Sequence, residues 1–125
     1  MSGRRWSCFG GALLPFATRK EGVVFVARSF RDEEEPALVD YYRAIQRAVS
    51  RCQLPLKLRR VDREEGDYEI SQQLMRDIDS ADIVIADYTL SSHNVYFEAG
   101  YARGKGKRLI QIARKGTVLQ FDVRN

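Results

Sequence analysis

Residues 77–102 read DIDSADIVIADYTLSSHNVYFEAGYA, and this stretch decides the fold. Its segment 83–86 is short, apolar and β-branched, which is typical of a central strand in a parallel sheet. Asp87 follows the strand, and a polar loop over 88–93 leads to a helix that we expect Asn94 to cap. Because ligands of open α/β sheets bind beyond the carboxyl ends of the strands, Asp87 and the loop are predicted to face a ligand.

The rest of the chain predicts three more strands and two more helices around this stretch. We expect the strands over 23–27, 54–61 and 109–113, and the helices over about 36–52 and 68–80. Strands that alternate with helices through short connections indicate right-handed crossovers and a parallel sheet. We therefore predict a single α/β domain whose open, mainly parallel sheet is flavodoxin-like, has the strand order 2-1-3-4 and is flanked by helices.

Four local features complete this prediction. The apolar stripe of the helix over 36–52 ends in Cys52, so we expect this cysteine in the core. The acidic run 32–35 is interpreted as a solvated helix start, stabilised by the helix dipole. In the last helix, Gly100 and its small neighbours are expected to allow close approach to the sheet. The glycine-rich turn over 104–108 is typical of a helix C-terminus.

Composition limits the class of protein. The chain has 125 residues, 44% hydrophobic and 30% charged, as expected for one soluble globular domain. A net charge of +4 favours anionic partners such as nucleotides without indicating nucleic acid. The two cysteines have no metal-ligand spacing, and no apolar run approaches the roughly 20 residues of a membrane span. We therefore expect a reduced, cytoplasmic protein without a metal site or a membrane partner.

The start and the end of the chain differ from its middle. Residues 1–20 contain no acidic residue and show no helix or strand period. Their basic and then apolar order faintly resembles an export signal, but glycines and Pro15 interrupt the apolar part. We expect a flexible leader over 1–21 and an α/β domain over 22–125. The tail after 113 is too short for another crossover, so the domain is either cut down at its C-terminus or completed by a partner chain.

Candidate site residues follow the first and third strands. Arg28 or Arg31 can pair with a phosphate and Phe30 can stack on a base, with a solvated surface or a plug on the sheet edge as equal alternatives. Asp87 and Glu98 would supply two carboxylates to one crevice. Breaking a glycosidic bond develops positive charge on the sugar, which a fixed carboxylate stabilises or attacks. The alternative for Glu98 is a carboxylate favoured only by the helix dipole.

The motif ADIVIADYT-x4-NVYFEAGYA over 81–102 resembles the central motif of the TIR-like and nucleoside 2-deoxyribosyltransferase-like superfamily. VFVARSF at 24–30, ISQQLMRDIDSAD at 70–82 and GKGKRLIQIAR at 104–114 resemble its first strand with the substrate loop, its second helix and its return strand. The resemblance covers most of 23–114. It implies a flavodoxin-like domain that cleaves or transfers the N-glycosidic bond of a nucleoside, a nucleotide or NAD.

The resemblance also implies roles for particular residues. Glu98 is expected to be the catalytic carboxylate at the anomeric carbon, with Asp87 as the second carboxylate of the site. The expected contacts to phosphate, ribose and base are Arg28, Ser29, Phe30, Ser91, Asn94 and Tyr96. His93 is either a polar surface residue or an acid–base group.

The chain departs from the transferase pattern at two loops. The loop before Glu98 is SSHNVYF instead of a glycine-rich acidic loop, and ARSF replaces the tyrosine-bearing first loop. Hydrolysis, transfer and binding therefore all remain open. We predict a hydrolase of the N-glycosidase type or an N-ribosyl or deoxyribosyl transferase, with no required cofactor and with NAD only as a candidate substrate.

The alternative function is a non-catalytic nucleotide-binding or TIR-like signalling and assembly module. In both cases, the expected partners are a small nucleotide or nucleoside and further copies of the chain in a homo-oligomer. Discrimination between the two functions rests on Glu98, because only an enzyme needs its carboxylate for turnover.

Overall fold

The computed structural model describes residues 21–59 and 68–120. Seven elements follow in chain order: β1 (Gly22–Ala27), α3 (Ala37–Arg51), β2 (Leu56–Arg59), α4 (Tyr68–Ser80), β3 (Ile83–Asp87), α5 (His93–Gly104) and β4 (Arg108–Ile112). Each expected strand and helix is present within a few residues of its predicted bounds. The expected leader up to residue 20 and the turn at 62–67 lie outside the described residues.

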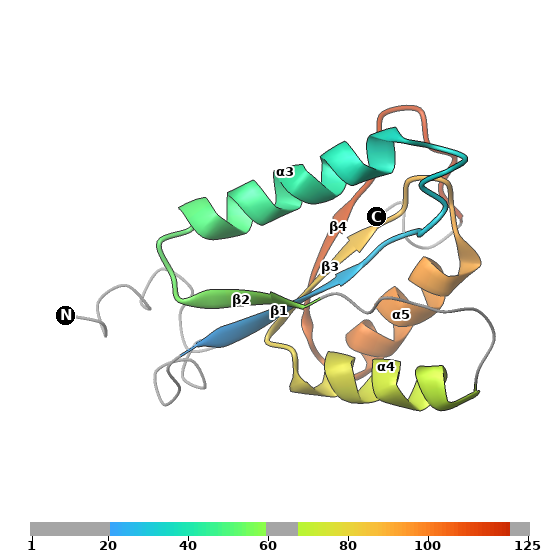
Figure 1. The fold of residues 1–125 in the computed structure, drawn as a ribbon. Helices are drawn as coiled ribbons and strands as arrows, with labels where there is room; N and C mark the ends of the chain where they lie inside the picture. The colour runs from blue at the N-terminus through green and yellow to red at the C-terminus, as the bar shows by residue number, and fades with distance from the viewer. Residues whose placement is uncertain (1–20, 60–67, 121–125) are drawn as a thin grey trace.

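The four strands form one parallel sheet with the order β2-β1-β3-β4, as predicted. In register, Val24 lies beside Ile83, and Ile85 lies beside Ile110. Helix α3 lies on one face of the sheet, and α4 and α5 lie together on the other (Figure 1). All four strands therefore end at the same edge, which the loops after β1 and β3 border.

The two faces of the sheet bury different apolar clusters. On the α4 and α5 face, a large cluster joins residues of β1 and β3 to both helices, including Phe25, Val84, Ile78 and Val95. On the α3 face, a smaller cluster surrounds Val24 and Ile83. Because β1 and β3 are covered on both faces, their residues are apolar except for Asp87 at the end of β3, whereas the outer strands β2 and β4 alternate in burial.

Two local expectations are wrong. Cys52 is exposed instead of buried, because α3 ends at Arg51 and Cys52 is its C-cap, one turn beyond the last stripe residue that contacts the core, Val49. Gly100 is also exposed, and a Cβ added there would meet no atom within 4 Å. The close approach of α5 to the sheet uses the buried Ala99 and Ala102 instead.

The predicted glycine C-terminus of α5 is confirmed. Gly106 has φ +70 and donates its N–H to the carbonyl of Arg103, while Lys107 donates to the carbonyl of Ala102. These two hydrogen bonds form a Schellman motif, which needs a residue in the left-handed region at this point. The motif turns the chain sharply from α5 into β4.

None of the helices in the described ranges is both long and apolar enough to cross a membrane.

Candidate active site

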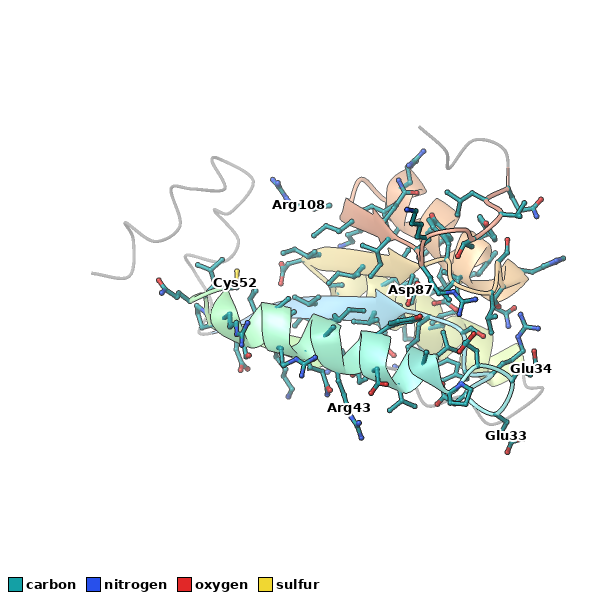
Figure 2. All side chains as sticks on the ribbon, turned by 90° about the horizontal axis from the view of Figure 1, so that it is seen from above. Glu33, Glu34, Arg43, Cys52, Asp87 and Arg108 are labelled. Atoms are coloured by element: carbon teal, nitrogen blue, oxygen red, sulfur yellow. The ribbon has the colours of Figure 1, made fainter. Side chains whose placement is uncertain are left out.

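Asp87 ends β3 and lies buried at the carboxyl edge of the sheet. Figure 2 places it at the same end of the molecule as Glu33 and Glu34, and opposite Cys52 and Arg108. Its Oδ1 accepts two hydrogen bonds from Thr89, one from the backbone N–H at 3.0 Å and one from the hydroxyl at 2.7 Å. Such an aspartate turn fixes the carboxylate and starts the loop that connects β3 to α5.

The loop after Asp87 is tied to the end of β4. The hydroxyl of Thr89, which is fully buried, accepts the N–H of Arg114 at 3.0 Å. The Tyr88 N–H donates to the carbonyl of Ile112 at 2.8 Å, and the Tyr88 hydroxyl donates to Gln111 at 2.7 Å. Asp87 therefore belongs to a hydrogen-bonded network that spans both strand ends.

Two residues of this loop have left-handed backbones. Leu90 has φ 70 and Ser91 has φ 49, conformations that cost non-glycine residues about 1 kcal/mol or more each. Three contacts hold them: the Ser91 N–H donates to the carbonyl of Tyr88 at 2.7 Å, Arg31 donates to the carbonyl of Leu90 at 3.2 Å, and the Ser91 hydroxyl lies 2.9 Å from that of Tyr96. The loop is thus fixed in one shape from both sides.

Helix α5 starts at His93, with Ser92 as its N-cap and no side-chain capping bond. The expected cap at Asn94 is therefore wrong, because Asn94 is already the second helical residue. Its side chain is exposed at the helix start, as is that of His93. A contact of Asn94 with ribose stays a prediction.

Glu98 is only 2% exposed. It lies in the second turn of α5, about 7.5 Å along the helix from His93 at 1.5 Å per residue. The buried residues of α5 are Val95, Glu98, Ala99 and Ala102, whose spacing of three and four defines the sheet-facing stripe. Placing a carboxylate on such a stripe is costly, so the helix dipole alone does not account for its position.

The two carboxylates approach the edge from opposite faces of the sheet. Along β3, Asp87 continues the alternation of Ile83 and Ile85, which lie on the α3 face. Glu98 belongs to α5 on the other face (Figure 1). The two carboxylates therefore belong to different faces of the sheet instead of forming a pair on one face.

Tyr96 packs on the loop that connects β3 to α5. Its ring stacks on that of Tyr88 at a centroid distance of 4.7 Å, and its hydroxyl accepts the N–H of Gln120 at 3.0 Å. Burial raises the pKa of the Tyr88 phenol. Of the predicted substrate contacts, Ser91 and Tyr96 are thus brought together, and one face of the Tyr96 ring is already covered.

Arg28 is buried where β1 ends. Its guanidinium donates to both oxygens of Asp32, at 3.0 and 3.3 Å, and to the carbonyl of Leu38 at 3.4 Å. The rings of Phe30 and Tyr42 lie 5.4 and 5.0 Å from its central carbon. Arg28 therefore fastens the first loop to α3. The nearby Ser29 is also buried, and its hydroxyl accepts the N–H of Arg31 at 3.3 Å.

The acidic run lies before α3, and Glu33 and Glu34 are exposed as expected for a solvated helix start, but the run also forms ion pairs. Three of its carboxylates form ion pairs with three arginines at the edge: Asp32 with Arg28, Glu34 with Arg31, and Glu35 with Arg114. The hydrogen bond from Arg114 holds the pKa of Glu35 below its ordinary value of 4.5 and raises that of Arg114. The run thus links the first loop to the ends of both β1 and β4.

Within residues 21–59 and 68–120, no three His, Cys, Asp or Glu side chains are grouped to hold a metal ion.

Comparisons with known proteins agree with this architecture. No protein-family model and no curated protein matches the sequence. Among solved structures, a 2-desoxiribosyltransferase from Leishmania mexicana superposes with a TM-score of 0.54 at 20% identity, over 74% of this chain and 64% of that chain. The CMP N-glycosidase of Clostridium botulinum gives a TM-score of 0.52 at 17% identity, over 73% of this chain and 71% of that chain. This chain has the fold of a deoxyribosyltransferase.

The likeness is one of fold, and the chain spans about two thirds of the length of each of these enzymes. Within this deoxyribosyltransferase-like fold, sequence analysis missed Thr89, Asp32 and Arg114, which orient the predicted residues. Thr89 was detectable, because Asp-x-Thr after a strand is typical of an aspartate turn. Arg114 was not, because its partner Glu35 lies 79 residues away in the chain.

Proposed function

We propose that this protein cleaves or transfers the N-glycosidic bond of a nucleoside or nucleotide, with Glu98 at the anomeric carbon. The observation that carries the proposal is the burial of Glu98 on the sheet-facing stripe of α5, behind a rigid polar loop at the carboxyl edge. The names of both enzymes with this fold, one a deoxyribosyltransferase and one an N-glycosidase, support this class of chemistry.

The proposed chemistry uses charge that develops on the sugar. When the bond between the anomeric carbon and the base nitrogen breaks, its electron pair leaves with the base and the sugar becomes positive. A carboxylate oxygen of Glu98 stabilises that charge or bonds to the anomeric carbon as a nucleophile. Water or an acceptor base then attacks the same carbon, and the departing base takes up a proton. A buried carboxylate is effective here, because low-dielectric surroundings strengthen its attraction to the sugar.

The other polar groups would bind and orient the substrate. Asp87, held by Thr89, and Ser91 border the same edge and offer oxygens for the sugar hydroxyls. Because their loop is fixed by hydrogen bonds on both sides, little reorganisation would be needed on binding.

The test is a search for released base. The purified protein is incubated with NAD and with matched nucleosides and nucleoside monophosphates in ribo and deoxyribo forms, alone and with a second base as acceptor. Free base detected by chromatography would support a glycosidase, and a new nucleoside only with acceptor would support a transferase. Thermal stabilisation by a nucleotide without any released base would instead support the nucleotide-binding module, and would contradict catalysis.

A further inference from the structure

Among the described residues, the loops that follow β1 and β4 carry three arginines at the carboxyl edge, and each already has a carboxylate partner. They differ in exposure: the side chain of Arg28 is 2% exposed, that of Arg31 is 47% exposed and that of Arg114 is 42% exposed. An incoming anion needs an arginine that is accessible and that can leave its partner. Only one of the three arginines is both accessible and weakly held by its carboxylate partner.

Arg28 does not meet it. Its two terminal nitrogens are used by the Asp32 carboxylate, and one of them also reaches the carbonyl of Leu38. The aromatic rings of Phe30 and Tyr42 also lie close to the guanidinium of Arg28. The Asp32 carboxylate is 38% exposed, but Arg28 is buried and held by three hydrogen bonds, so a phosphate cannot engage it without breaking them.

Arg114 is accessible but strongly held. It donates to both Glu35 and the Tyr41 hydroxyl, and the hydrogen bond to Glu35 is the largest cause of the raised pKa of Arg114. Glu35 also accepts the N–H of Ala37 at the start of α3. Moving Arg114 would therefore disturb the start of a helix as well as an ion pair.

Arg31 meets both conditions. Its partner Glu34 is 60% exposed, and ion pairs between solvated side chains contribute little to stability. The second terminal nitrogen of Arg31 donates to the carbonyl of Leu90 at 3.2 Å, in the loop that connects β3 to α5. The guanidinium of Arg31 thus bridges the loops that follow β1 and β3, at the edge where the proposed sugar site lies.

We propose that Arg31 binds the phosphate of a nucleoside monophosphate, exchanging Glu34 for the phosphate, and that it gives the protein a preference for nucleotides over nucleosides. This inference rests on the proposed function and names its substrate class. A phosphate dianion accepts two parallel hydrogen bonds from a guanidinium and carries more charge than the Glu34 carboxylate. Of the neighbouring carboxylates, Asp32 and Glu35 are already neutralised by Arg28 and Arg114.

The exchange predicts opposite effects for the two partners. Arg31→Ala should remove the hydrogen-bond donors for the phosphate, whereas Glu34→Gln should strengthen phosphate binding, because it removes the competing charge. The matched control is Arg43→Ala. Arg43 pairs with Asp40 at the same spacing of three residues and is also exposed, but it points away from the sheet on α3 (Figure 2).

The experiment measures calorimetric binding of cytidine 5′-monophosphate and cytidine to the wild type and the three variants. We expect the wild type to prefer the monophosphate, Arg31→Ala to lose about 10- to 100-fold of that preference, Glu34→Gln to increase it, and Arg43→Ala to leave it unchanged. Equal binding of both compounds by the wild type, or an unchanged preference in Arg31→Ala, would overturn the inference while base release still supports the proposed function. A protein that neither binds nor cleaves any nucleoside or nucleotide would overturn both.

Discussion

Thr89 joins the loop between β3 and α5 to the end of β4 through its hydroxyl. Its hydroxyl donates to Asp87 and accepts from the backbone of Arg114, and the side chain is fully buried. A buried hydroxyl that uses both donor and acceptor in this way joins two strand ends through a single atom. Without that oxygen, the N–H of Arg114 loses its acceptor. Oδ1 of Asp87 then keeps only the hydrogen bond from the backbone N–H of residue 89.

Thr89→Val therefore should destabilise the protein by about 1–3 kcal/mol, the usual cost of leaving buried polar groups unsatisfied. Thr89→Ser is the matched control, because it keeps the hydroxyl and removes only a methyl group. Urea denaturation followed by circular dichroism gives both free energies of unfolding. If valine is tolerated as well as serine, the hydroxyl does not hold the loop.

The ion pair between Glu35 and Arg114 makes stability depend on pH. The folded pKa of Glu35 lies below its ordinary value of 4.5, chiefly because of the hydrogen bond from Arg114. The pair therefore contributes fully above about pH 4.5, and its contribution is lost as the pH falls through the lower folded pKa.

Arg114→Ala should raise the pKa of Glu35 toward 4.5 and reduce the resistance of the fold to acid. Side-chain carboxyl shifts followed by NMR titration measure the pKa directly. Arg43→Ala, which removes an arginine paired with Asp40, should leave the pKa of Glu35 unchanged. If the pKa of Glu35 shifts equally in both variants, the cause is the general loss of positive charge and not the specific pair of Glu35 with Arg114.

Among the elements, α5 has two features with separate roles, a buried stripe and a C-terminal motif. Its buried stripe holds Glu98 against the sheet, and its Schellman motif fixes where it ends. Gly100 belongs to neither feature, since it is exposed and borders open space. A glycine there lowers helix stability without any gain in contact.

Gly100→Ala should accordingly stabilise the protein by about 0.5–1 kcal/mol, the difference between glycine and alanine inside a helix. Ala102→Leu, at a fully buried position of the same helix, should destabilise it by overpacking. Thermal denaturation of both variants tests the pair. A loss of stability in Gly100→Ala would mean that something approaches this position closely.

The elements were predictable because β1 and β3 are almost entirely apolar and because strands and helices alternate along the chain. The strand order was predicted from right-handed crossovers together with a switch point beside the first strand, as in flavodoxin-like sheets. Side-chain partners were not predictable in the same way. The acidic run over 32–35 has an obvious local explanation as a helix start, yet three of its carboxylates pair with arginines. Arg28 and Arg31 lie in the same loop after β1, and Arg114 follows β4, far away in the chain. Asn94 failed as a cap because Ser92 caps the helix two residues earlier, a difference that lies within the usual uncertainty of helix bounds.

In the molecule as a whole, the two faces of the sheet are covered unequally. Among the described elements, α4 and α5 cover one face, while only α3 lies on the other (Figure 1). Ile110 of β4 lies beside Ile85 on the α3 face and is 45% exposed, whereas Ile78 of α4 is fully buried. The expected homo-oligomer stays a prediction, but this difference gives a measurable contrast between the faces.

Ile78→Ala should cost about 2–5 kcal/mol, as expected for truncation in a closed core. Ile110→Ala should cost less than about 1 kcal/mol, because much of the side chain is already in water. Both values come from denaturant unfolding at several protein concentrations. A similar cost at both positions would show that the face over β4 is covered in solution.

The central claim is that the buried carboxylate of Glu98 carries out the chemistry. The most direct test is the single-turnover rate of base release by Glu98→Gln, beside the control Glu33→Gln. Glu33 is an exposed glutamate at the same end of the molecule as Asp87 (Figure 2). Unfolding curves confirm that both variants are folded. We predict that Glu98→Gln lowers the rate at least about 100-fold while nucleotide binding persists, and that Glu33→Gln leaves the rate unchanged. A wild-type rate in Glu98→Gln would contradict the claim and leave Glu98 as a structural residue.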